Sequence, residues 1–93
     1  MDYEWDETKS RQTLESRGFD FTFAARVFDD EWRLERIDRR RAYGEDRHQA
    51  IGAIDGETYF VVFTRRPTAT RIISARRAHD HEDRAYRQGT AWC

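Results

Sequence analysis

The sequence predicts a small α+β fold in which two N-terminal helices precede an antiparallel sheet of three or four strands, and a C-terminal helix closes the chain. Two observations carry this prediction. Apolar residues repeat at helical spacing near the N-terminus, and from residue 46 the pattern changes to the β-branched and aromatic runs typical of strands. A chain of 93 residues is too short for two independent cores, so we expect one domain over residues 1–93.

Capping signals place the two N-terminal helices. Asp6 is expected to cap a helix over residues 7–17, which Gly18 would end, with Leu14 as its main core residue. Asp20 is expected to cap a short second helix. The apolar side chains of that second helix recur four positions apart, as Phe23 with Val27 and Ala24 with Phe28.

The first strands are expected in the middle of the chain. Residues 29–44 are charged and show no regular pattern. Within them, a short strand is expected over 34–37. Residues 47–54 have β character. Asp55-Gly56 then gives a strong signal for a type I′ hairpin turn, because both central residues of that turn need a positive φ.

The most apolar segment, residues 58–64, is nearly continuous in β-branched and aromatic side chains, which indicates a central strand covered on both faces. Pro67 interrupts strand pairing and marks a turn, and residues 71–74 form the next strand. Residues 77–88 are predicted as the closing helix, ended by Gly89.

Composition limits the class of protein and its compartment. Charged residues make up 38 % of the chain, but an aromatic content of 14 % argues for a folded core. No apolar run approaches the roughly 20 residues of a membrane span, and the acidic N-terminus does not suit a signal peptide. The single cysteine, Cys93, excludes an internal disulfide and fits a reducing compartment, so we expect a cytoplasmic protein.

The positive charge is almost all arginine, since Lys9 is the only lysine among 17 basic residues. The planar guanidinium fork suits bidentate contact with phosphate. Preference for arginine codons in a GC-rich genome explains the bulk excess equally well. The positions of the arginines must therefore decide between the two explanations.

Three arginines near the third long strand are candidates for phosphate contact. Strand alternation predicts two opposite sets, with Arg71 and Ile73 on one face and Ile72, Ser74 and Arg76 on the other. Arg66 closes the preceding strand, so Arg66 and Arg71 would lie near the turn and Arg76 at the opposite end. The alternative is that all three are solvated edge charges.

The closing helix carries a carboxylate on the side expected to meet the sheet. Ala78, Glu82 and Tyr86 share one stripe, whereas the opposite side carries Asp80, Asp83, Arg84 and Arg87. A buried carboxylate needs a charged partner, and Arg76 or another strand arginine is the natural candidate. Glu82 therefore belongs either to a catalytic site or to a structural ion pair.

The histidines and motifs exclude some chemistry. His79 and His81, two positions apart on a helix, would point about 200° apart, so no metal site is predicted. His48, beside Arg47 at the start of a strand, is either a general base or an ordinary surface histidine. The sequence contains no Walker motif, dinucleotide-binding loop or nucleophile elbow, and we expect no cofactor.

A series of sequence blocks in order along almost the whole chain resembles a known family. The blocks are Glu4-Trp5-Asp6 with Lys9 and Gly18, residues 24–29, residues 44–47 with Ile51-Gly52, residues 61–64 with Arg66, and residues 71–76 (Arg-Ile-Ile-Ser-Ala-Arg) with Ala78, Glu82 and Tyr86. They resemble the BrnT toxins of type II toxin–antitoxin pairs, which have a RelE-like fold. Two positions depart from the family, namely Ser16-Arg17-Gly18 in place of Lys-His-Gly, and His48 in place of an aromatic residue.

The resemblance implies metal-independent RNA cleavage, growth arrest and neutralisation by an antitoxin. Together with the residue types, it predicts a catalytic set of Arg66, Arg76, Glu82 and Tyr86, and an RNA-binding set of Lys9, Arg47, His48 and Arg71. Glu82 would act as a base or orient an arginine, and Tyr86 would stack on a base or donate a proton. The alternatives are a catalytically weakened module that binds RNA or antitoxin, and a purely structural partner domain.

The resemblance also implies the partner, a BrnA-type ribbon-helix-helix antitoxin that forms a heterotetramer and alone contacts operator DNA. Large aromatic residues exceed what so small a core is expected to hold: Phe19, Phe21, Phe23, Phe28, Trp32 and Trp92. Exposed aromatics commonly mark interfaces, and core packing is the alternative explanation for them.

Overall fold

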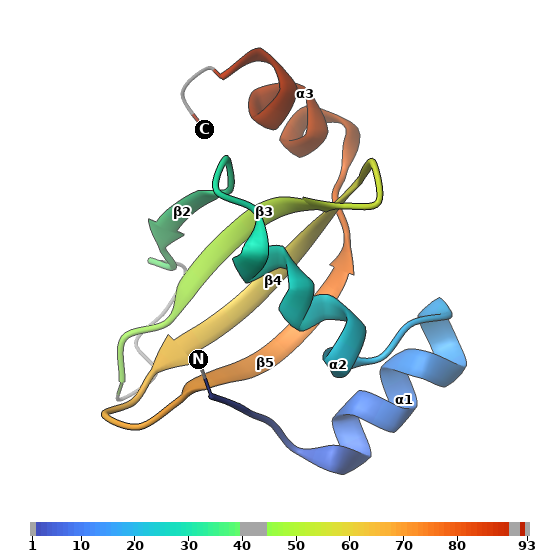
Figure 1. Cartoon of the computed structure of the whole chain (residues 1–93), viewed down its shortest axis with the longest axis vertical. Coiled ribbons are helices and arrows are strands. Elements are labelled where there is room, and N and C mark those ends of the chain that lie inside the picture. The colour runs from blue at the N-terminus through green and yellow to red at the C-terminus, as the bar shows by residue number, and fades with distance from the viewer. Residues whose placement is uncertain (1, 40–44, 90–91, 93) are drawn as a thin grey trace.

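The computed structural model describes residues 2–39, 45–89 and 92, and it shows a five-stranded mixed sheet with helices against both faces (Figure 1). The strand order across the sheet is β1 (Tyr3–Glu4), β5 (Thr70–Arg77), β4 (Glu57–Arg65), β3 (His48–Ile54) and β2 (Leu34–Ile37). β1 runs parallel to β5, and every other pair is antiparallel.

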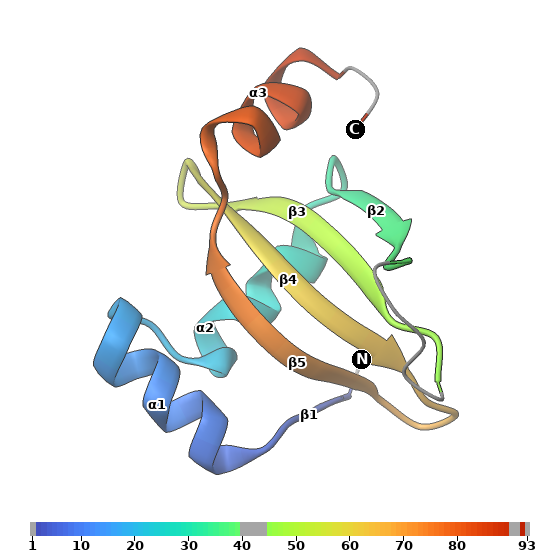
Figure 2. The same ribbon diagram turned by 180° about the vertical axis from the view of Figure 1, so that it is seen from behind.

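The helices divide between the two faces of the sheet. Helix α2 (Phe21–Ala24) and the 3-10 helix η1 (Ala25–Asp29) lie on the first face, with α1 (Glu7–Arg17) beside them near β5. Helix α3 (Asp80–Gln88) lies at one end of the second face, as the view from behind shows (Figure 2). No helix in the described part of the chain combines the length and apolar character that crossing a bilayer requires.

The α+β class is confirmed, but the prediction of a wholly antiparallel sheet of three or four strands is wrong. The additional strand is β1, which pairs Tyr3 with Thr70 and Glu4 with Arg71. Two residues are too few to show a strand periodicity, so only the contact with β5 defines this element. The predicted short strand over 34–37 is confirmed as β2.

Both predicted helix caps are confirmed, but the buried side of α1 is not the expected one. The carboxylate of Asp6 accepts hydrogen bonds from the amides of Thr8 and Lys9, and Gly18 ends the helix at a φ of 85°. Leu14 is 47 % exposed, so its prediction as the main core residue of this helix is wrong. Ser10 packs inward instead, because its hydroxyl accepts a hydrogen bond of 3.0 Å from the Phe21 amide.

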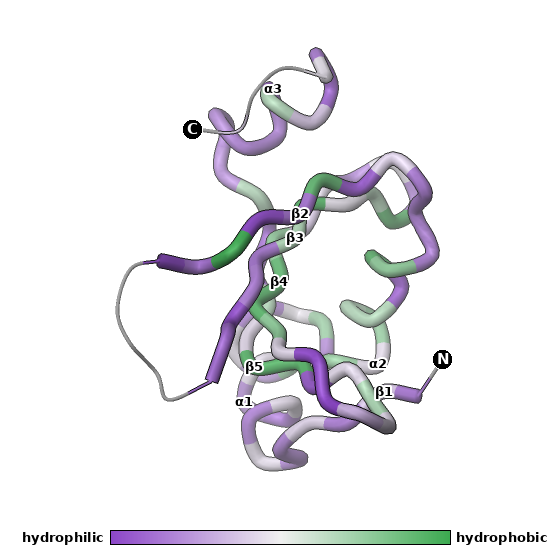
Figure 3. The backbone as a smooth tube through the Cα atoms, turned by 90° about the vertical axis from the view of Figure 1, so that its left-hand side faces the viewer, coloured by the Kyte–Doolittle hydropathy of each residue, from purple (hydrophilic) through white to green (hydrophobic). Residues whose placement is uncertain are grey.

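The core confirms the sequence pattern of the central strand. Residues 58–64 of β4 are all buried, and the Asp55-Gly56 turn that precedes them has a positive φ at both positions, 52° and 87°. Phe63 lies on the first face, where its ring packs edge-on against Phe28 with 4.8 Å between centroids. Figure 3 shows the hydrophobic segments along β4 and α2, whereas α1 is mostly hydrophilic.

Strand β5 departs from simple alternation. Phe63 pairs with Ile72, but the next β4 residue, Val62, pairs with Ser74, so Ile73 is an extra residue in β5. Arg71 and Arg76 consequently lie on the same, second face, and their predicted separation onto opposite faces is wrong. A β-bulge of this kind cannot be recognised from residue spacing, because the extra residue Ile73 has the same side chain as Ile72 beside it.

Helix α3 begins at Asp80 and not at Arg77 as predicted. Arg77 still pairs with Tyr59 in the sheet, and the Ala78 amide donates to the Thr58 carbonyl. His79 is the N-cap, and its own amide donates to the Glu82 carboxylate. Backbone pairing with β4 therefore extends the strand further than the helical pattern of the sequence suggests.

Gly52 offers a direct test of the contact between η1 and the sheet. A Cβ atom at this position would lie 2.8 Å from Val27 Cγ1 and 3.1 Å from the Val27 carbonyl oxygen. We therefore expect Gly52→Ala to lower the free energy of unfolding by about 1–3 kcal/mol, measured by urea denaturation. The Val27→Ala change removes the clashing methyl groups, so its effect should be smaller in the Gly52→Ala background than alone; strict additivity would contradict the clash.

Candidate functional site

The second face of the sheet, which carries Phe60, Val62 and Ile51, brings arginines from two strands together. Arg71 and Arg76 come from β5, and Arg36 comes from β2 at the other side of the sheet. Helix α3 lies over only one end of this face, as Figure 2 shows. The predicted positions along the strands are confirmed, because Arg66 and Arg71 lie near the β4–β5 turn and Arg76 lies at the opposite end.

At the α3 end, Arg76 and Glu82 form the expected ion pair. Arg76 Nη1 and Nη2 lie 2.8 Å and 3.0 Å from the two carboxylate oxygens of Glu82, which is only 4 % exposed. Burial by itself raises the pKa of this carboxyl, but hydrogen bonds from Arg76 and the His79 amide outweigh burial and hold the pKa below its usual value. The Arg76 guanidinium also lies 3.9 Å above the Phe60 ring centroid. Glu82 is therefore an anion that fixes the orientation of Arg76.

Tyr86 links α3 to Asp30, the residue that follows η1, through a hydrogen bond. Its hydroxyl donates a hydrogen bond to Asp30 Oδ2, and Asp30 also accepts from the amides of Trp32 and Ala53. Burial and the bond to Asp30 raise the pKa of Tyr86 to about 12, so the hydroxyl keeps its proton at neutral pH. In this arrangement its proton is directed at a carboxylate of the protein.

The opposite end of the second face holds a second group of charges, the Glu4 cluster, which consists of Glu4, Arg66, Arg71 and Glu45. Glu4 Oε1 lies 3.3 Å from Arg66 Nη1 and 3.8 Å from Arg71 Nη1, and Arg66 Nη2 lies 3.6 Å from Glu45 Oε1. These side chains are 32–43 % exposed. Glu4 Oε1 itself is buried, yet no described residue donates a hydrogen bond to it.

Two of the remaining predicted residues, Lys9 and His48, lie away from both groups. Lys9 is exposed on α1. The ring of His48 stacks on Phe63 at 5.5 Å, on the first face. The Arg47 carbonyl accepts from the Asp38 amide just before β3. The structure thus divides the eight predicted residues among separate regions and adds Glu4. No pattern in the sequence singles out Glu4, because its position beside Arg71 depends on the two-residue strand β1.

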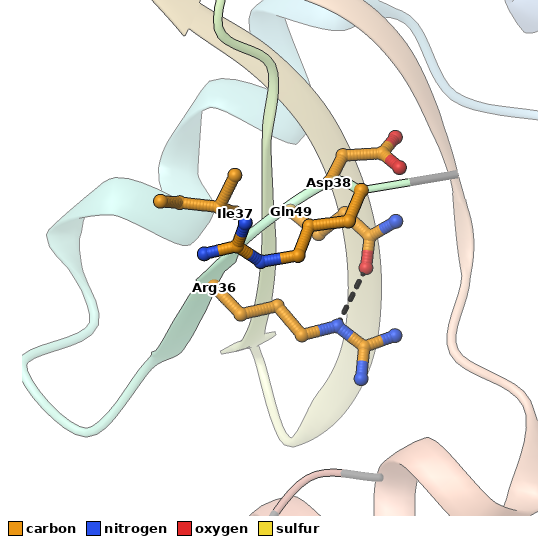
Figure 4. A pocket seen from close by; sticks show the side chains of 5 residues that line it. Arg36, Ile37, Asp38 and Gln49 are labelled. Carbon is orange, nitrogen blue, oxygen red and sulfur yellow. Dashed lines mark hydrogen bonds between the residues drawn. The ribbon is translucent and has the colours of Figure 1, made fainter. Parts of the chain in front are cut away.

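A cavity of about 550 Å³ opens beside β2 (Figure 4). It is lined by Arg36, Ile37, Asp38, Arg39 and Gln49. Arg36 Nε donates a 2.7 Å hydrogen bond to Gln49 Oε1, which is the dashed line in Figure 4. The cavity therefore has a guanidinium and a fixed side-chain amide in its wall.

Most of the six large aromatic residues pack in the core, which is the alternative explanation to a partner interface. Phe19, Phe21 and Phe28 are buried, whereas Trp32 is 75 % exposed beside α3. Trp92 is partly buried against the second face. Trp32 is therefore the residue of the set that a partner can reach most freely.

The described residues include no group of three or more His, Cys, Asp and Glu side chains placed to hold a metal ion. The angular argument about His79 and His81 does not apply, because His79 precedes the helix and the two ring centroids lie 6.0 Å apart. The pair lacks a third ligand among the described residues.

Comparison with known proteins supplies the family. The family model for BrnT, the ribonuclease toxin of type II toxin–antitoxin systems, matches residues 5–82, which is most of the chain. No match to a curated protein was found. The matched segment contains the arginines of β5, the β4–β5 turn and Glu82. The chain belongs to the BrnT family of ribonuclease toxins.

Proposed function

We propose that this protein is a metal-independent endoribonuclease that arrests growth by cleaving RNA bound along the second face. The Glu4 cluster carries the proposal. A buried carboxylate oxygen that accepts from no donor among the described residues, and that lies between two guanidinium groups, is an incomplete polar site. Such orphaned acceptors are uncommon in folded proteins and fit a position where a substrate hydroxyl supplies the missing donor.

The chemistry of RNA cleavage without a metal suits these residue types. Glu4 would take the proton of a 2′-hydroxyl as that oxygen attacks phosphorus. Arg66 and Arg71 would neutralise the charge that builds up on the phosphate oxygens, because guanidinium groups pair well with phosphate. The bond from phosphorus to the 5′-oxygen then breaks, and that oxygen takes a proton from water.

The other predicted residues receive supporting roles in this proposal. Arg76 would contact a second phosphate, and Glu82 is a positioning residue that acts through Arg76. Tyr86 would keep α3 in place through Asp30. Lys9 and His48 receive no contact with RNA on this face, because they lie on α1 and on the first face.

A type II toxin has an antitoxin, and we propose a BrnA-type ribbon-helix-helix protein in a heterotetramer. The complex would act in the cytoplasm, and the antitoxin alone would contact operator DNA. Trp32, 75 % exposed, supports the presence of a protein interface. Co-expression with the product of a small adjacent gene, followed by light scattering, tests this partner.

The activity is tested by incubating purified protein with total RNA in EDTA. Cleavage supports the enzyme, and a mobility shift without cleavage supports the alternative, a weakened binding module. One observation favours that alternative. Arg17 replaces the family's histidine and donates a 2.7 Å hydrogen bond to the Ala75 carbonyl, so this side chain secures the edge of β5.

Salt dependence separates a localised arginine cluster from a diffuse basic surface. If Arg47, Arg66, Arg71 and Arg76 neutralise about four phosphates of a single strand, log affinity should fall with a slope near −3 per decade of salt. Alanine at Arg66 or Arg71 should flatten the slope by roughly 0.7 for every RNA sequence. Arg84 on the exposed side of α3 is the matched control, and equal effects from Arg84→Ala and Arg66→Ala would contradict localisation.

A further inference from the structure

Trp92 forms a stack with Arg36 on the second face. The Arg36 guanidinium lies 3.8 Å from the indole centroid, and Arg36 Nη1 donates a 3.3 Å hydrogen bond to the Trp92 carbonyl oxygen. The ring of Phe60 meets the indole edge-on, at 6.1 Å between centroids and an interplanar angle of 90°. Side chains from β2 and β4 thus contact the planar indole on its face and on its edge.

The N–H group of the Trp92 indole lacks a hydrogen-bond acceptor among the described residues, although Nε1 is buried. A buried N–H group without an acceptor opposes burial, whereas the contacts of the ring faces favour it. The position therefore suits a flat aromatic ring, but its edge is not matched to indole.

The surroundings of this position are polar at one edge. Arg36 and Gln49 also line the cavity of about 550 Å³ shown in Figure 4. Gln49 is only 3 % exposed, and its carbonyl oxygen is fixed by Arg36 Nε. Cavities of this size are usual for small ligands, and a fixed guanidinium with a side-chain amide can recognise the edge of a heterocycle.

We propose that Arg36, Phe60 and Gln49 form a subsite for one RNA base, and that the Trp92 indole occupies it in the free protein. A nucleobase is planar and can stack on the Arg36 guanidinium as the indole does here, with the Phe60 ring meeting it edge-on. Unlike indole, it carries several polar groups on its edge. Phe60 also lies under the Arg76 guanidinium, so the subsite adjoins an arginine of the proposed phosphate track.

The subsite rests on the proposed function, since it assumes that RNA lies on the second face. RNA binding would then move Trp92 from the stack. The indole competes with the base for Arg36, and removing a competitor that fills the subsite about nine-tenths of the time should tighten binding about tenfold.

The test measures binding of a short 2′-O-methyl RNA oligonucleotide, which the enzyme cannot cleave. We expect Trp92→Ala to bind about tenfold more tightly than wild type, and Trp32→Ala, the matched control, to bind as wild type does. Arg36→Lys keeps the charge but loses the planar stack, and it should weaken binding about tenfold with the salt slope unchanged. RNA should change the tryptophan emission of wild type but have little effect on Trp92→Phe.

Each other outcome overturns the subsite in a recognisable way. Unchanged affinity of Trp92→Ala would show that the indole does not compete with RNA. Weaker binding by that variant would show that the indole is part of the binding platform. If wild type both binds and cleaves RNA while Trp92→Ala and Arg36→Lys match it, the subsite alone is wrong. If no form binds RNA, the proposed function fails as well.

Discussion

Replacing Glu4 by glutamine is expected to slow RNA cleavage by about 10²–10⁴-fold, because the amide cannot accept the proton of the attacking 2′-hydroxyl. RNA binding should be as tight as in wild type or tighter, since the change removes a negative charge beside Arg66 and Arg71. Single-turnover cleavage of a labelled RNA, together with the affinity for its 2′-O-methyl analogue, separates the two effects.

The control is Glu57→Gln, which also removes a carboxylate paired with an arginine but lies away from the cluster. Glu57 Oε2 is 2.6 Å from Arg77 Nη2, and both side chains are well exposed. Its cleavage rate should stay within about twofold of wild type, as expected for an exposed pair. If folded Glu4→Gln cleaves as fast as this control, Glu4 is not the base. If cleavage and affinity fall together, Glu4 only positions the two arginines.

Glu82→Gln is expected to have the largest effect on stability, a loss of about 2–4 kcal/mol in the free energy of unfolding. The change removes the negative charge that faces Arg76 in a site where the carboxylate is 4 % exposed, and it weakens the bond to the His79 amide that caps α3. Removing one partner of a buried pair leaves the other without compensation, although Arg76 is 27 % exposed and water moderates the loss. Chemical denaturation measures the difference, with Glu57→Gln again as control at under about 1 kcal/mol.

The same variant has a defined pH dependence. The pKa of Glu82 is lower in the folded protein than its usual value of 4.5. The carboxylate therefore stabilises the fold above about pH 5, and this contribution is lost as the pH falls through the folded-state pKa. Wild type and Glu82→Gln should differ most near neutral pH and converge in acid. A difference that stays constant down to pH 3 would show that the charge of Glu82 does not contribute.

Local signals in the sequence determined much of the fold correctly. Asp6 and Asp20 cap their helices, and Asp55-Gly56 makes the hairpin, because each signal acts within a few residues of its own position. The buried run of β4 and the need of Glu82 for a cationic partner also follow from local patterns. A hydrophobic strand must be covered, and a carboxylate on the inner side of a helix must find a cation.

The sequence did not determine features that depend on residues far apart in the chain. Strand β1 exists only through its pairing with β5, and the extra residue in β5 becomes a bulge only against β4. Leu14 is exposed because the Ser10 side of α1 meets α2.

The candidate site divides in the same way. The sequence by itself determined that arginines would concentrate in and around β5 and that Glu82 would need an arginine partner from the strands. Only the tertiary structure decided that Arg71 and Arg76 share a face, that Glu4 lies between Arg66 and Arg71, and that Trp92 stacks on Arg36. The physical reason is that helix caps, turns and hydrophobic runs depend on neighbouring residues. The composition of a charged site depends on which strand edges and chain ends come together on folding.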